Sequence, residues 1–210
     1  MKPIAFLLAL PVVMAVLIML PNGARADTVI DDWNAAKVPP PPVLKSVTID
    51  PKKTALLDMD FSRKTCTPQG RPRCAAMLPT IRGFIDKARA AGVTIVDIYS
   101  TAMARDDMAI VPGSGDLVMQ ASLNKFYGND LAATLKNRGI DSVIITGTSA
   151  NGAVLFSVGG AAANGFKVIV PVDGMPADGL YQEQFTAWEI VNAPTVSGAS
   201  TLTRWDMITL

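Results

Sequence analysis

The sequence predicts an α/β protein in which a mostly parallel six-stranded sheet lies between two layers of helices. Apolar runs of strand length alternate with segments of helical periodicity. The strands are apolar throughout, which is typical of strands covered on both faces. Such strands joined by helices form parallel sheets through right-handed crossovers. We therefore expect a three-layer α/β/α domain of the Rossmann-like kind.

Each element has a local justification in the chain. The run TALLDMD predicts a buried strand over 54–60 that ends in an acid. Apolar residues at helical spacing predict a helix over 79–91, which Gly92 ends. By the same reasoning, further strands are expected over 93–99, 116–119, 142–146, 167–172 and 201–203, and further helices over 130–138, 151–164 and 178–191. The irregular connection between residues 100 and 128 is long, and such loops are often functional lids.

The chain divides into three segments. Residues 1–26 have the features of a signal peptide, because a lysine precedes an apolar core over 4–20 and Ala24-Arg25-Ala26 offers a cleavage site. An uncleaved membrane anchor is the alternative. Residues 27–53 form a proline-rich extended arm with VPPPPV at 38–43, which lies on the domain, reaches a second subunit or acts as a loose tether. Residues 54–210 form the folded domain. Cleavage would leave a periplasmic or secreted protein with no stable membrane insertion.

Composition excludes several kinds of chemistry. The chain has no histidine, so no Ser-His-Asp or Cys-His arrangement and no imidazole metal site can form. A general base in this protein must therefore be an Asp, a Glu or a Lys. No acidic cluster has metal-ligand spacing, and we expect neither a metal nor a cofactor. Charges nearly balance, with 19 Lys and Arg against 18 Asp and Glu, so nucleic-acid binding has no electrostatic support.

The two cysteines flank a short proline- and glycine-containing loop, CTPQGRPRC. In an exported protein the expected state is a disulfide between Cys66 and Cys74. The alternative is a free nucleophilic thiol near the site.

The most informative stretch is VIITGTSANGAV at 143–154, where a buried strand is followed by a turn of small residues and a helix. Ligands collect at the carboxyl ends of parallel strands, because helix N-termini there supply free N–H donors. Together with TALLDMDF at 54–61, KFYGNDLAATLKNRGID at 125–141 and GFKVIVPVDGM at 165–175, this stretch resembles the isochorismatase-like cysteine hydrolases. The resemblance covers roughly residues 54–208 and implies that family's fold.

The resemblance implies a site in which an Asp, a Lys and a nucleophilic Cys act together. By position the Asp falls on Asp60, the Lys on Gln120 and the Cys on Ala153. It also implies a cis peptide at Thr148–Ser149 and oxyanion donors from the N–H groups of Ser149 and Ala153. Because Ala153 has no heteroatom, the family's thiol chemistry cannot occur at this position.

Several neighbouring side chains have two interpretations. Ser149 and Asn151 either contact a ligand or begin the helix as caps. Lys125 is either a displaced catalytic lysine or an exposed or structural residue at a helix entry, and we expect the second. Asp58 either joins Asp60 as a carboxylate pair or forms an ion pair with Arg63 or Lys64, and again we expect the second.

Three functions follow from these residues. The first is a hydrolase of a small amide-, imide- or vinyl-ether-type substrate that uses a non-cysteine mechanism, with Asp60 as the base. The second is a catalytically inactive protein that binds a small molecule through Gln120 and Asn151. The third is an interaction role through the proline-rich arm. The expected partner is a small-molecule ligand, and a homo-oligomer is compatible with the sequence.

Overall fold

The computed structural model of the chain describes residues 26–210. The expected signal peptide lies, apart from Ala26, outside the described residues. The chain divides into two units, Met1–Pro39 and Pro40–Leu210. Of the first unit, residues 26–39 are exposed, with one short 3-10 turn, η1, at Trp33–Ala35. No helix in the described part of the chain is long and apolar enough to span a bilayer.

A six-stranded sheet forms the centre of the second unit, which confirms the expected α/β fold. Its order is β4-β3-β2-β5-β6-β7, and every pair of neighbours is parallel. The strands are β2 (Thr54–Met59), β3 (Thr94–Ser100), β4 (Leu117–Ala121), β5 (Ser142–Gly147), β6 (Lys167–Pro171) and β7 (Ser200–Thr203). The central pair, β2 and β5, is buried along almost its whole length.

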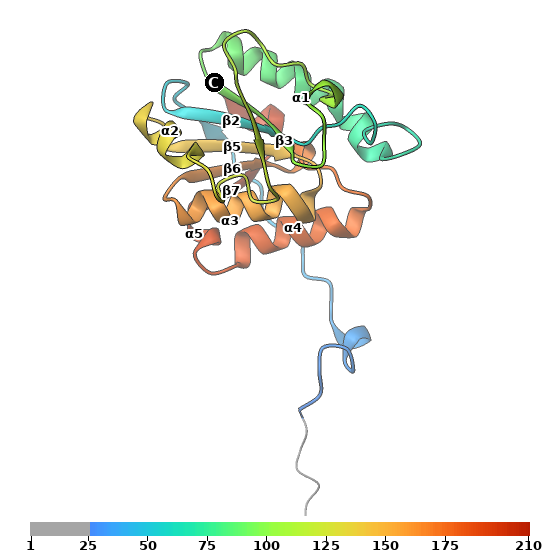
Figure 1. Cartoon of the computed structure of the whole chain (residues 1–210). Helices are drawn as coiled ribbons and strands as arrows, with labels where there is room; N and C mark the ends of the chain where they lie inside the picture. Colours follow the sequence, from blue (N-terminus) through green and yellow to red (C-terminus); the bar gives the residue numbers. More distant parts are fainter. Residues whose placement is uncertain (1–25) are drawn as a thin grey trace, which may run out of the picture. The chain divides into compact units, whose positions relative to one another are not determined.

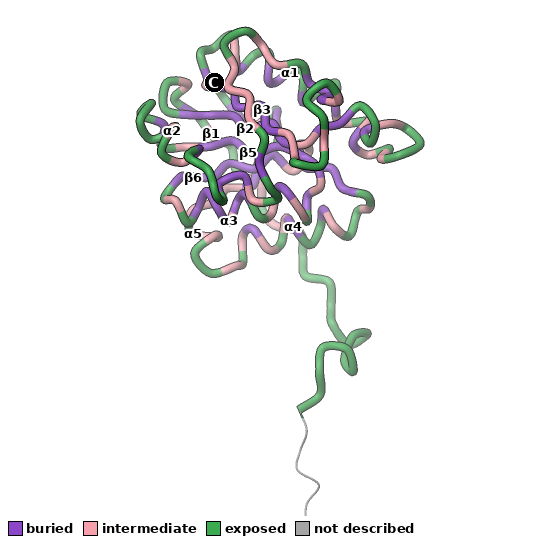
Figure 2. The backbone as a smooth tube through the Cα atoms, in the orientation of Figure 1, coloured by how far each residue is buried: buried purple, intermediate pink, exposed green. Residues whose placement is uncertain are grey.

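Helices cover the sheet on both faces. Helix α1 (Pro72–Ala90) lies on one face, and α3 (Leu155–Ala163), α4 (Leu180–Asn192) and α5 (Val196–Ala199) lie on the other (Figure 1). Helix α2 (Leu131–Asn137) packs into the same hydrophobic cluster as α3. Figure 2 shows buried backbone along the strands and exposure on the outer faces of the helices. The arrangement is the expected three-layer α/β/α sandwich.

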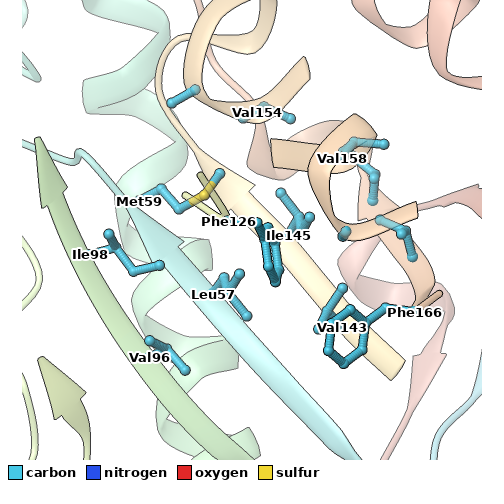
Figure 3. Packing of buried hydrophobic residues seen from close by; sticks show 14 of the residues in the cluster. Leu57, Met59, Val96, Ile98, Phe126, Val143, Ile145, Val154, Val158 and Phe166 are labelled. Atoms are coloured by element: carbon cyan, nitrogen blue, oxygen red, sulfur yellow. The ribbon is translucent and has the colours of Figure 1, made fainter. Parts of the chain in front are cut away.

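Two hydrophobic clusters hold the layers together, one on each face of the sheet. Alternate residues of β2 divide between them: Leu57 and Met59 enter the cluster beneath α3, whereas Leu56 enters the cluster beneath α1. Figure 3 shows the first cluster, in which Leu57 and Met59 pack with Phe126 and Val158 from other layers. Burial on both faces fixes the register of β2 and so the place where it ends.

Helix α1 begins earlier than the sequence predicts. It starts at Pro72 and continues through Pro79, which we expected to be the first residue of the helix. Pro72 occupies the first turn, where a missing N–H costs nothing, so it can start the helix. Buried Cys74 and Leu78 then anchor the additional turns, and Pro79 is accommodated in the interior.

The end of the proline-rich segment belongs to the folded domain. Residues 40–53 lie within the second unit, where β1 (Val47–Thr48) pairs in parallel with β8 (Ile208–Thr209). Ile49 is buried in the cluster beneath α1, and the Lys45 N–H donates to the Leu202 carbonyl. This part of the expected arm therefore lies on the domain.

Candidate functional site

The candidate site lies where the central strands β2 and β5 end. Asp60 directly follows β2 and adopts a positive φ of 61°, a conformation that non-glycine residues rarely take outside functional sites and turns. Its N–H donates to the Ile98 carbonyl at 2.9 Å. The Thr148 N–H, just beyond β5, donates to the Met59 carbonyl at 3.0 Å. These bonds hold Asp60 beside the turn that follows β5.

Lys125 is the partner of Asp60 and is buried, so the expectation of an exposed residue is wrong, while the choice between a structural and a catalytic role stays a prediction. Its side chain is 0 % exposed, and its Nζ lies 2.7 Å from Asp60 Oδ2. The Lys125 N–H donates to the buried Ser157 hydroxyl of α3, which fixes the loop that carries it. A lysine ammonium and a carboxylate at this distance form a charge-assisted hydrogen bond.

Gln120, which aligns with the family's lysine, does not take that role. It is exposed on the edge strand β4, and its Nε2 lies 3.5 Å from the Ser100 carbonyl. The lysine that contacts Asp60 is Lys125, five positions later along the chain, in the loop that follows β4. The one sequence signal was the neighbour of Lys125, Phe126, an aromatic residue that anchors the loop in the core.

Two opposing influences act on the Asp60 carboxyl. Burial raises the pKa of Asp60 above its usual value, and the hydrogen bond and charge of Lys125 oppose that rise. The second carboxyl oxygen, Oδ1, is buried and has no hydrogen-bond partner within residues 26–210. One carboxyl oxygen of Asp60 is thus fixed by Lys125, and the other is enclosed by the protein next to the backbone of Ser100, which also lowers the pKa of Asp60.

The turn after β5 has the form that the resemblance implied. The Thr148–Ser149 peptide is cis, and a π-helical turn, η3 (Ala150–Val154), connects it to α3. Gly152 interrupts this turn with φ −118° and ψ −109°. The Ala150 N–H donates to the Pro176 carbonyl at 3.2 Å, which ties the turn to the segment after β6.

Ala153 is 3 % exposed and belongs to the cluster beneath α3. Its methyl group stands at the nucleophile's position in the motif. Ser149 and Asn151 do not cap the helix: the Ser149 hydroxyl donates to the Asn151 side-chain oxygen at 2.9 Å. Their expected contact with a ligand, and the oxyanion role of the Ser149 and Ala153 N–H groups, stay predictions.

Sequence reasoning missed an arginine beside the cis peptide. Arg71, just before α1, donates through Nη1 to the Thr148 hydroxyl at 2.6 Å and through Nε to Asp178 at 2.7 Å. Two residues on, Arg73 forms a bidentate ion pair with buried Glu183, which also accepts the Ala177 N–H. The only signal for this arrangement was the RPR tripeptide inside the cysteine loop.

The expected disulfide between Cys66 and Cys74 is present, with the two Cα atoms 5.0 Å apart. It closes the loop that carries Arg71 and leaves no free thiol in the described chain. A nucleophilic cysteine therefore comes from neither position 153 nor this loop.

The prediction that Asp58 pairs with Arg63 or Lys64 is wrong. Asp58 is buried in register with Asp97 of β3, while Lys64 pairs with Asp107 instead. Burial and the nearby Asp97 carboxyl raise the pKa of Asp58 well above its usual value. Asp58 does not form a catalytic pair with Asp60 either, because Asp60 lies past the strand end, where its positive φ breaks the alternation of side chains.

Burial, reinforced by the neighbouring Asp116, also raises the pKa of Asp97, to about 7. Asp116 in turn is held by Arg89 of α1 at 2.7 Å and by the Gly113 N–H at 2.6 Å. The three carboxyls and Arg89 form a network on the α1 side of the sheet.

The residues that resemble a catalytic site do not line the cavity of about 690 Å³ that is bounded by Arg63 and by residues between 105 and 118. Within residues 26–210, no group of three carboxylate or cysteine side chains converges in a way that could hold a metal ion.

Fold and site together define a hydrolase-like α/β protein with an acid–lysine pair at the ends of its central strands. The isochorismatase domain model matches residues 54–201. The chain belongs to the isochorismatase family.

Solved structures of that family superpose on the chain. An isochorismatase family protein from Desulfovibrio vulgaris subsp. vulgaris str. Hildenborough has a TM-score of 0.64 at 18% identity, over 73% of this chain and 95% of that one. N-carbamoylsarcosine amidase from Thermoplasma acidophilum has a TM-score of 0.62 at 23% identity, over 73% of this chain and 97% of that one. At these identities the likeness establishes the fold.

A curated relative matches over a shorter stretch. N-carbamoylsarcosine amidase from Arthrobacter sp. is 36% identical over 69 residues, which span 32% of this chain and 26% of that protein.

Proposed function

We propose that this protein hydrolyses a small amide-, imide- or vinyl-ether-type substrate with water as the nucleophile. The observation that carries the proposal is the buried Lys125–Asp60 pair beside the β5 turn, in a site where Ala153 replaces the thiol. Removing an ammonium or a carboxylate from water costs about 5 kcal/mol per ion. An acid–lysine pair kept at that cost, after loss of the sulfur, supports continued chemistry rather than packing alone.

The Asp60 carboxylate, whose side chain is 14 % exposed, accepts a proton from a water molecule, and the water oxygen attacks the carbonyl carbon of an amide substrate. Lys125 orients the carboxylate and stabilises its charged form. Developing charge on the carbonyl oxygen is met by the N–H groups of Ser149 and Ala153, whereas those of Thr148, Ala150 and Gly152 already donate to carbonyls of the chain. The carbon–nitrogen bond then breaks, and the leaving amine takes the proton from Asp60. The proton that Asp60 takes from water is the one that it gives to the leaving amine, and no covalent enzyme intermediate forms.

The proposal is tested by incubating the full chain with a panel of amides, imides and vinyl ethers, beside an Asp60→Asn variant. Loss of positioned general-base catalysis lowers the rate by about 10²–10⁴-fold, so turnover should vanish in the variant. Arg138→Gln, a change at an exposed position after α2, is the matched control and should keep the wild-type rate.

A second function, ligand binding without catalysis, is favoured by one observation: Ala153 offers no nucleophilic atom. It predicts that no member of the panel is turned over, while some raise the melting temperature of the protein. Turnover that survives in Asp60→Asn would contradict both functions as assigned to this site.

We also propose that the protein is exported. The features of residues 1–26 support this location, and so does the Cys66–Cys74 disulfide, because such bonds persist in oxidising compartments.

A further inference from the structure

Arg71 is anchored more firmly than an ordinary surface arginine. The Cys66–Cys74 disulfide closes the loop that carries it, and the Arg73–Glu183 pair fastens the same loop to α4. The Arg71 side chain is only 20 % exposed. The position of its guanidinium is therefore set by covalent and ionic contacts on both sides.

The Arg71 guanidinium lies beside the turn that follows β5. Its Nη1 bonds the hydroxyl of Thr148, and the Thr148 N–H bonds the carbonyl of Met59, the residue before Asp60. Thr148 also begins the cis peptide from which the turn is built. Arg71 is thus linked to the turn directly, and to the strand end that carries Asp60 through Thr148 and Met59.

The charge of Arg71 is balanced by a group that can move away. Within residues 26–210 its ion pair is with Asp178, whose side chain is 69 % exposed. Lys125 and Asp60, by contrast, neutralise each other inside the protein. Nε and Nη1 are engaged, while Nη2 makes no hydrogen bond in the described part of the chain. Displacement of the solvated Asp178 would free Nε beside the unoccupied Nη2, and these two donors together are suited to binding a carboxylate in bidentate fashion.

We propose that Arg71 binds a carboxylate of the substrate and that Asp178 occupies this place until the substrate arrives. The inference rests on the proposed function and narrows its substrate class to small monoamides or imides that carry an acid group. Asp178 and the substrate carboxylate then compete for the same donors, and Asp178 weakens binding.

The test measures binding of succinamate, which carries a carboxylate, and of the uncharged succinamide, by calorimetry at low salt. Malonamate and glutaramate, one carbon shorter and longer, give the spacing between the acid and the amide. The wild-type protein should bind at least one of these anions about tenfold or more tightly than succinamide, as expected for a charged hydrogen bond. Arg71→Gln, which can still bond Thr148, should remove the preference. Arg71→Lys should recover only part of it.

The Asp178→Asn variant is the most decisive part of the test, because its effect on anion binding should be opposite to that of the Arg71 variants. Removal of the competing carboxylate should strengthen binding of the anions and leave succinamide unchanged. If Arg71 only holds the loop in place, Asp178→Asn weakens or does not change anion binding, and the proposal is overturned. The melting temperature of each variant shows whether the fold is intact.

Arg63→Gln is the matched control, because Arg63 is an exposed arginine that lines the separate 690 Å³ cavity. It should keep the preference for anions. Loss of the preference in Arg63→Gln, or equal binding of charged and uncharged amides by the wild type, would overturn the proposal. Binding that discriminates charge without any turnover would sink the proposed hydrolysis and leave the role of Arg71 standing.

Discussion

At the scale of single residues, the buried pair Lys125–Asp60 dominates the energetics of the site. Lys125→Met would leave a buried carboxylate without its partner and should destabilise the protein by about 3–5 kcal/mol at neutral pH. Adding Asp60→Asn removes the orphaned charge, so the double variant should be more stable than Lys125→Met alone. Urea unfolding of the four proteins of this cycle measures the coupling. Additive effects would show that the two side chains do not interact.

One substitution at position 153 should restore a reactive thiol. An Ala153→Cys variant places a thiol on the turn next to the strand end that carries Asp60 and its partner Lys125. If the site admits a small reagent to this buried position, the thiol pKa should fall and its alkylation by iodoacetamide should be fast. Because Lys125 supplies the ammonium, adding Gln120→Lys should bring no further rise in the alkylation rate. A thiol that reacts no faster than free cysteine, or that needs Gln120→Lys, would contradict the assignment of Lys125.

The sequence predicted part of the site and missed the rest for a physical reason. Asp60 could be found because it ends a buried strand, and the turn at 148–153 because it follows another. Lys125 and Arg71 could not be found in this way, because loops bring them to the site through contacts with distant elements. Such contacts depend on loop conformation, which no periodicity in the sequence encodes.

At the scale of elements, β2 and β3 carry a feature that controls stability with pH. The Asp58 and Asp97 carboxyls face each other across these strands, with Asp116 and Arg89 on one side and the Asp60 charge beyond the strand end. Asp58 Oδ1 and both oxygens of Asp97 have no hydrogen-bond partner in the described chain when both groups are ionised. A proton shared between the two carboxyls would give a hydrogen bond to one oxygen of each.

The sign of the pH dependence follows from the raised pKa values. Both carboxyls hold protons more tightly in the folded chain, so the unfolded chain releases them first as the pH rises above about 4. Folding stability should therefore fall as the pH rises from about 4 to at least the pKa of Asp97, about 7. Melting temperature against pH measures this. Asp58→Asn should flatten the decline, and Asp130→Asn, at an exposed position before α2 where the side chain makes no cap hydrogen bond, should not. A rise in stability over this window would contradict the shared proton.

The elements also show where local sequence signals were sufficient. Buried strands such as β2 and β5 were predicted to within a residue or two, because burial on both faces leaves a continuous apolar run. The start of α1 was missed because Pro79 looked like a beginning, whereas Pro72 is the one that the structure uses. The pairing of β1 with β8 joins the two ends of the domain, and two-residue strands carry no detectable pattern.

At the scale of the whole molecule, the first 26 residues and the disulfide make a joint prediction about location. Expressed from its own first residue in a bacterial host, the chain should appear in the periplasmic fraction with Asp27 as its first residue and with Cys66 and Cys74 oxidised. Cell fractionation and intact-mass spectrometry check both features. Unprocessed protein in the membrane fraction would instead support an uncleaved anchor.

The central claim is that Asp60 activates water in a family site that has lost its sulfur. It is tested most directly by a single turnover in H₂¹⁸O, with enzyme in excess over an amide substrate. Our account predicts that the first product carboxylate carries one ¹⁸O atom and that the protein gains neither label nor adduct mass. Unlabelled product, with ¹⁸O later found in the peptide that contains Asp60, would show direct attack by the carboxylate and contradict the account.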